Sequence, residues 1–199
     1  MTRASRLATA SLAIAVTVLA LKAAAWWITG AVALLADAVE SIVNVAASAT
    51  ALAAVLYSQR PADANHPYGH AKAEYFSAVF TGVLIVVAAI SILRESWFAL
   101  LAPRAPDQPA LGLGISAVAT AINAVWAWVL IRRGRALGSP ALRADGRHLL
   151  ADVVTSLGVI LGIWLVVLTG ELWIDPALAA ATAANILWSG WRLMRESVG

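Results

Sequence analysis

The sequence predicts an all-α membrane protein with six transmembrane helices and both termini in the cytoplasm. Three observations predict this fold class. Of the 199 residues, 61% are hydrophobic and only 13% are charged, whereas soluble domains carry about 25% charged residues. The apolar residues form runs of about the 20 residues that a helix needs to cross a bilayer. Basic residues gather in alternate connections between these runs.

Turn-forming residues separate the runs. Gly30 ends the first run, two prolines mark the loop after the second, and Pro103 follows the third. A basic segment with two glycines, residues 132–140, is expected to form a loop between the fourth run and the fifth. The predicted spans are approximately residues 7–28, 31–57, 71–101, 109–131, 141–168 and 175–197, within one transmembrane domain covering residues 1–199.

The N-terminus resembles a signal peptide, because Arg3 and Arg6 precede an apolar stretch. However, Lys22 interrupts that stretch, and Trp26 and Trp27 stand where a cleavage site would be. We therefore interpret this segment as an uncleaved first span.

The distribution of basic residues predicts the orientation. Cytoplasmic loops of membrane proteins are enriched in Lys and Arg. The N-terminus, the C-terminus and the loops after the second and fourth spans hold eleven of the fourteen basic residues: Arg3, Arg6, Arg60, Lys72, Arg132, Arg133, Arg135, Arg143, Arg147, Arg192 and Arg195. The net charge of +3 is thus a topology signal, and we expect lipid rather than nucleic acid as the partner. Tryptophans near span ends, Trp126 among them, are interpreted as interface anchors.

Ionisable residues inside two spans are the main functional signal. A charged group at a helix centre costs about 2.5–3.5 kcal/mol on insertion scales, so it needs a partner or a function. At 100° per residue, one face of the second span carries Asp37, Glu40, Ser41 and Asn44, and one face of the fifth carries Asp145, His148 and Asp152. The two sets share a spacing, which indicates either a remnant repeat or convergence.

Each of these spans offers two donors four residues apart, Glu40 with Asn44 and His148 with Asp152. Two such helices packed face to face would present four donors around one point. His and carboxylate ligands suit Zn²⁺, and oxygen-rich sets admit Mn²⁺, Fe²⁺ or Co²⁺. The absence of cysteine excludes thiolate ligands. Interhelical hydrogen bonding and a pure proton relay remain open as alternatives.

A second polar cluster lies in the loop after the second span. Asp63, His66 and His70 could coordinate one ion, with water completing the shell. The alternative is an ordinary polar loop with helix-capping residues.

Three blocks of the sequence resemble the cation diffusion facilitator family of metal/proton antiporters. They are Ala33-Leu34-Leu35-Ala36-Asp37-Ala38-Val39-Glu40-Ser41, His66-Pro67-Tyr68-Gly69-His70-Ala71-Lys72-Ala73-Glu74, and Arg143-Ala144-Asp145 through His148 to Asp152. The resemblance covers essentially the whole chain.

The resemblance implies a homodimer in a bacterial inner membrane that exports divalent transition-metal cations in exchange for protons by alternating access. The family's transport site falls on Glu40, Asn44, His148 and Asp152, and its loop site on Asp63, His66 and His70. We expect Asp37 and Asp145 to line the vestibules of the transport site.

The cargo and the domain content are further expectations. Zn²⁺ or Fe²⁺ is favoured as cargo, with Mn²⁺, Co²⁺ and Cd²⁺ as other candidates, and no prosthetic group is expected. Glu40 and Asn44 depart from the residues of well-known zinc exporters, which leaves the metal open. We also expect no soluble C-terminal domain, because the sequence stops just after the sixth span.

Two other function classes are weighed against a transporter. A membrane-embedded metalloenzyme would be expected to carry a motif such as His-Glu-x-x-His, which does not occur. A structural subunit would tolerate apolar residues on both polar faces.

Overall fold

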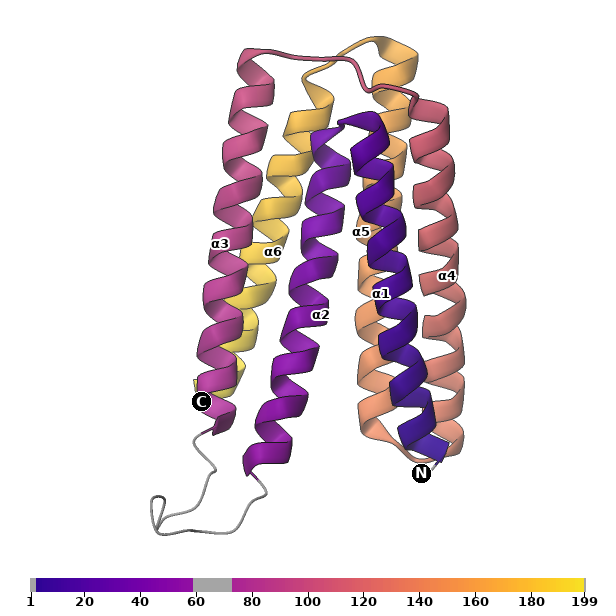
Figure 1. The fold of residues 1–199 in the computed structure, drawn as a ribbon, viewed down its shortest axis with the longest axis vertical. Helices are drawn as coiled ribbons and strands as arrows, with labels where there is room; N and C mark the ends of the chain where they lie inside the picture. The colour runs from indigo at the N-terminus through magenta and orange to yellow at the C-terminus, as the bar shows by residue number, and fades with distance from the viewer. Residues whose placement is uncertain (1–2, 59–72, 199) are drawn as a thin grey trace.

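The computed structural model describes residues 3–58 and 73–198, and these residues form six helices and no strand. The helices are α1 (Arg3–Thr29), α2 (Val32–Ser58), α3 (Ala73–Leu101), α4 (Pro109–Ala136), α5 (Pro140–Thr169) and α6 (Ile174–Val198) (Figure 1). Helices α1 to α5 each contain a stretch long and apolar enough to cross a membrane. In the described part of α6, polar residues such as Asp175, Asn185 and Ser189 interrupt the apolar residues, and no such stretch is found there. The predicted all-α membrane fold is confirmed.

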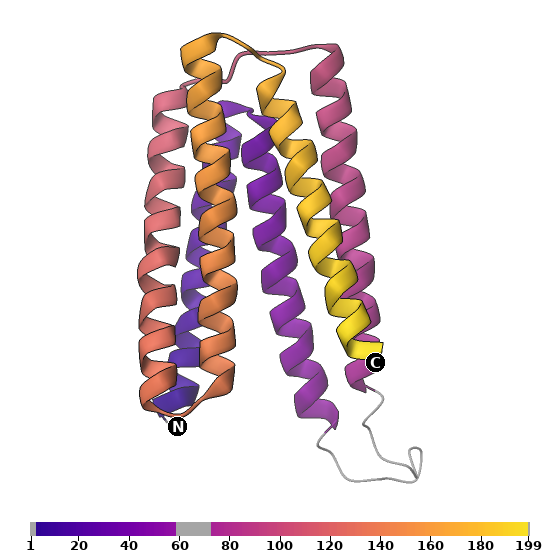
Figure 2. The ribbon, with the colours of Figure 1, turned by 180° about the vertical axis from the view of Figure 1, so that it is seen from behind.

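The helices form two groups of three. Helix α4 packs against both α1 and α5, and α2, α3 and α6 pack against one another. We call these groups the 1-4-5 bundle and the 2-3-6 bundle. Figures 1 and 2 show that the bundles approach each other near the short turn between α1 and α2 and diverge at the opposite end, where α1 begins and α6 ends. We call these two ends the turn end and the terminal end.

Small buried side chains hold the 2-3-6 bundle together. Its core consists of Ala36 and Val43 from α2, Ile85, Ala88, Ala89 and Ile92 from α3, and Ala179, Ala183 and Ile186 from α6. Small residues let membrane helices approach closely, which increases their van der Waals contact. Ala179 and Ala183 of α6 therefore allow it to pack closely against α2 and α3.

Polar contacts fix the turn-end portion of α2 in the same bundle. The Asp175 carboxylate at the start of α6 accepts hydrogen bonds from the backbone N–H groups of Val32 (2.9 Å) and Ala33 (2.8 Å). The Ser96 hydroxyl in α3 donates to the carbonyl of Pro176. Asp175 thus caps α2 from another helix, where a negative charge complements the helix dipole.

A second apolar cluster joins the two bundles near the turn end. It contains Ala25 from α1, Ala31 from the connection between α1 and α2, Ala33 and Leu34 from the start of α2, and Val159 and Ile163 from α5. The connection itself is tight, since Gly30 adopts a φ of 65° that is costly for most other residues. Helix α1 accordingly ends at Thr29, directly before Gly30.

Helix α4 extends beyond the predicted fourth span, residues 109–131. We predicted a loop over residues 132–140, but the helix continues through three arginines to Ala136. Arginine is a strong helix former, and Arg133 and Arg135 in the last turn complement the negative end of the helix dipole. The Arg132 guanidinium also lies over the Trp128 ring, 5.2 Å from its centroid.

Candidate cation site

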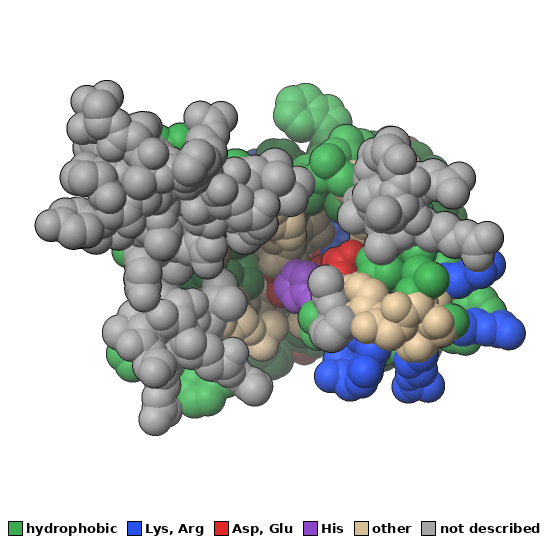
Figure 3. Space-filling view, turned by 90° about the horizontal axis from the view of Figure 1, so that it is seen from below, with side chains coloured by type: hydrophobic (Ala, Val, Ile, Leu, Met, Phe, Trp, Pro, Cys, Tyr) green, Lys and Arg blue, Asp and Glu red, His purple; other side chains and the backbone are tan. Residues whose placement is uncertain are grey.

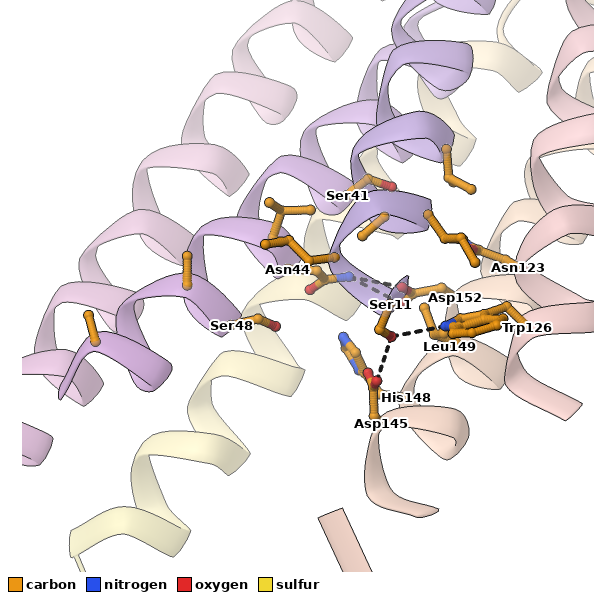
Figure 4. A pocket seen from close by; sticks show the side chains of 17 residues that line it. Ser11, Ser41, Asn44, Ser48, Asn123, Trp126, Asp145, His148, Leu149 and Asp152 are labelled. Carbon is orange, nitrogen blue, oxygen red and sulfur yellow. Dashed lines mark hydrogen bonds between the residues drawn. The ribbon is translucent and has the colours of Figure 1, made fainter. Parts of the chain in front are cut away.

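A cavity of about 710 Å³ lies between the two bundles. Helices α1, α2, α4 and α5 line it. Its polar side chains are Ser11, Ser41, Asn44, Ser48, Asn123, Trp126, Asp145, His148 and Asp152 (Figure 4). Seen from the terminal end, the molecule is hollowed between the bundles, and histidine and acidic side chains are visible in the hollow (Figure 3). The cavity therefore places ionisable groups within reach of solvent at that end.

The two polar faces predicted on the second and fifth spans meet across this cavity. The Asn44 amide on α2 donates to both carboxylate oxygens of Asp152 on α5, at 3.2 and 3.1 Å (Figure 4). Asp152 is only 7% exposed, so its carboxylate has little contact with water. The Asn44 amide supplies hydrogen bonds in place of that water. This pair bridges the 1-4-5 and 2-3-6 bundles.

The other two predicted ligands lie on either side of that pair. His148 is exposed and lines the cavity one turn nearer the terminal end. Glu40 is half-buried beside Thr155 and does not line the cavity. Its Oε2 atom is buried without a hydrogen-bond partner among the described residues. Within residues 3–58 and 73–198, no three His, Asp or Glu side chains come close enough to hold one metal ion.

Asp37 occupies a different environment from the vestibule that we expected for it. Its Oδ1 atom accepts a hydrogen bond from the Lys22 ammonium (2.9 Å) and another from the Ser156 hydroxyl (2.8 Å). Lys22 and Asp37 are 2% and 1% exposed. The contacts join α1, α2 and α5 on the turn-end side of Glu40. In this structure, Asp37 is therefore part of a buried ion pair.

Asp145 does line the cavity, near its terminal end, where we expected a vestibule. Its carboxylate accepts a hydrogen bond from the Ser11 hydroxyl (2.7 Å), which itself accepts one from the Trp126 indole N–H (3.0 Å) (Figure 4). The chain of contacts links α5, α1 and α4. Sequence reasoning missed Ser11 and interpreted Trp126 as an interface anchor, whereas its ring lines the cavity.

One predicted group cannot be placed. Asp63, His66 and His70 fall within residues 59–72, which lie outside the described residues. The loop site stays a prediction.

The cavity thus combines carboxylate, imidazole and amide groups at the junction of two helical bundles, which is a donor set suited to cations. The family model described as the cation efflux transmembrane domain matches residues 8–199 of the chain. The chain belongs to the cation efflux family. This match covers nearly the whole chain, as does the resemblance noted from the sequence.

Individual members of the cation efflux family are also similar to this chain. An uncharacterised transporter of Synechocystis sp. is 46% identical over 188 residues, which cover 94% of this chain and 61% of that relative. The cation-efflux pump FieF of Salmonella arizonae is 34% identical over 203 residues, covering 98% of this chain and 64% of the pump. FieF of Salmonella paratyphi A aligns to the same extent. The chain therefore spans less than two thirds of the length of these relatives.

Proposed function

We propose that this protein is a secondary active transporter that exports divalent transition-metal cations in exchange for protons. The observation that carries the proposal is the cavity between the bundles, which opens at the terminal end and holds Asn44, His148 and Asp152. The orphaned Oε2 atom of Glu40 supports the same role, because a buried carboxylate oxygen without a donor is suited to bind a cation.

In the proposed cycle, a cation approaches from the terminal end and passes Asp145 and His148. It then loses water to a ligand set of Glu40, Asn44, His148 and Asp152. To complete this set, the two bundles would move closer together around α2 and α5, since three such groups do not meet in the described structure. Reorientation of the bundles would open the site at the turn end.

Protons provide the counter-flow in this proposal. Imidazole and carboxylate groups bind a metal only when deprotonated, so metal and protons compete for the same atoms. Arrival of a proton at His148 or Asp152 would release the cation on the far side.

The orientation follows from the charge distribution. Arg132, Arg133, Arg135, Arg143 and Arg147 lie at the terminal end of α4 and α5, and cytoplasmic faces are rich in basic residues. We therefore place the terminal end and both termini in the cytoplasm. The bacterial relatives support the inner membrane as the location, and the family resemblance implies a homodimer. Zn²⁺ and Fe²⁺ remain the favoured cargo.

The test is metal flux in proteoliposomes containing a fluorescent metal indicator, with an imposed proton gradient. Wild type should move Zn²⁺ or Fe²⁺, and Asp152→Ala should reduce the flux to that of empty vesicles. Glu95→Gln serves as the control, because Glu95 is an exposed α3 carboxylate near Arg94, and it should transport normally. Absence of flux in wild type for every divalent cation tried would refute the proposal.

Proton coupling is tested in the same vesicles. His148→Ala should weaken metal-driven proton movement more than Asn44→Ala does. The reason is that an imidazole can bind and release a proton, whereas an amide does not titrate. Full proton flux in His148→Ala would contradict the role assigned to that histidine.

A further inference from the structure

Lys22 is the only buried cation among the side chains that the structure describes. It lies about two turns before the end of α1 and is 2% exposed, and its ammonium donates a hydrogen bond to Asp37 at 2.9 Å. Burying an ammonium is costly unless it is paired. A lysine in this position therefore calls for a reason beyond holding two helices together, which apolar residues do at lower cost.

Asp37 uses only one of its two oxygens in this arrangement. Both Lys22 and Ser156 donate to Oδ1, while Oδ2 is buried with no hydrogen-bond partner in the described part of the chain. Lys22 is thus the one charged group shown to balance Asp37. If the ammonium were removed, the Ser156 hydroxyl would be the one described donor left to the Asp37 carboxylate.

The ion pair lies close enough to the proposed transport site to affect it electrically. Asp37 lies three residues before Glu40 on α2, and Ser156, which donates to Asp37, lies four residues after Asp152 on α5, so the ion pair is about one helical turn from both carboxylates. These four side chains comprise three carboxylates and one ammonium, which leaves two negative charges. That remainder matches one divalent cation, with His148 neutral.

We propose that Lys22 is a charge-setting residue, which neutralises Asp37 and thereby fixes the transport site at the two negative charges that a divalent cation balances. This inference rests on the proposed function. Without Lys22, a bound divalent cation would face three carboxylates and leave one negative charge over. Without Asp37, the free ammonium would repel the incoming metal.

The proposal predicts opposite effects from the two partners of one ion pair. In purified protein at pH 8, Lys22→Met should tighten Zn²⁺ binding roughly tenfold and Asp37→Asn should weaken it roughly tenfold, as expected for one added or removed negative charge near a divalent ion. The double variant Lys22→Met/Asp37→Asn should bind within about threefold of wild type because the net charge returns to its original value. Lys22→Arg, which keeps the charge, should also remain close to wild type.

Two measurements separate this charge effect from a structural one. Titration calorimetry gives the Kd for Zn²⁺ alone and for Cd²⁺ alone. A change in charge should shift both constants by the same factor, whereas a distorted ligand geometry would change their ratio. In transport assays, Lys22→Met should lower KM and kcat together, because tighter binding slows release.

The outcomes divide clearly. Weakened binding in both single variants, or unchanged binding in both, would overturn the proposal and leave the ion pair as a helix tether. If Lys22→Met does not fold, Asp37→Asn and the double variant still decide: recovery in the double variant supports the proposal, and equal loss in both contradicts it. Failure of wild type to bind or move any divalent cation would instead refute the proposed function.

Discussion

The cap that Asp175 provides to α2 offers the sharpest test of how the fold positions the site. Replacing Asp175 with alanine removes both oxygens that accept hydrogen bonds from the N–H groups of Val32 and Ala33, at 2.9 and 2.8 Å. Asp175 is 5% exposed, so these N–H groups would lose their partners in a setting with little water. The negative charge at the positive end of the α2 dipole would be lost as well.

The size of the effect can be worked out from these contacts. A hydrogen bond to a charged group contributes about 1.5–3 kcal/mol, and removal of a helix cap costs about 0.5–2 kcal/mol. Two bonds would give about 3–6 kcal/mol if no water replaced the carboxylate. Because Val32 is partly exposed whereas Ala33 is buried, water can reach one of the two N–H groups, which should bring the cost toward the lower limit. We expect Asp175→Ala to lower the free energy of unfolding by about 3 kcal/mol.

Reversible unfolding in mixed micelles of dodecyl maltoside and SDS, followed by far-UV circular dichroism, measures this difference. Glu171→Gln is a suitable control, since Glu171 is exposed and its carboxylate accepts a hydrogen bond from the Trp173 indole at the surface. Its cost should stay within about 0.5 kcal/mol. An equally small cost for Asp175→Ala would refute the reasoning that this carboxylate holds α2 in the 2-3-6 bundle.

Two further predictions concern the contact between bundles and the packing inside one of them. Asn44→Asp should lower the melting temperature of the metal-free protein, because two carboxylates would then face each other where Asn44 now donates to Asp152. Added Zn²⁺ should raise the melting temperature of this variant by more than it raises that of wild type. Equal melting temperatures of the two proteins without metal would contradict this. Gly146→Ala should destabilise the 1-4-5 bundle by about 1–3 kcal/mol, since a Cβ there would lie 2.9 Å from the Ala127 carbonyl. Gly158→Ala on the same helix meets nothing within 4 Å and should be neutral or slightly stabilising in the same unfolding assay.

The polar faces of two helices were predictable from the sequence because they depend on one helix at a time. A spacing of three and four residues places Asp37, Glu40 and Asn44 on one face whatever the rest of the fold does. The cost of charge in a membrane then predicts that this face turns inward. The contact between Asn44 and Asp152 agrees with that reasoning.

The choice of partners was not predictable in the same way. Lys22 and Asp37 lie on different helices, and their pairing depends on how far α1 slides along α2, which no local pattern encodes. The same applies to Ser11, whose bonds to Asp145 and Trp126 require three helices in register. A serine in an apolar span carries no signal of its own, because it often bonds within its own helix.

There is also a physical reason why Glu40 and His148 do not meet at one point with Asn44 and Asp152 in this structure. A sequence specifies every state that a transporter visits, whereas one structure represents a single state. Helical periodicity can indicate which groups are able to converge, but it does not specify the state in which they do.

The amide of Asn44 has a consequence for cation release in the proposed transport cycle. If the site contained carboxylates without other polar partners, its free energy would increase steeply when the cation left, and release would therefore be slow. Here an amide already donates to both oxygens of Asp152, so under the proposed function a neutral group of the protein would replace a departing ion. The site would bind its cation less tightly but release it over a lower barrier. Such a site would be suited to rapid turnover rather than to storage.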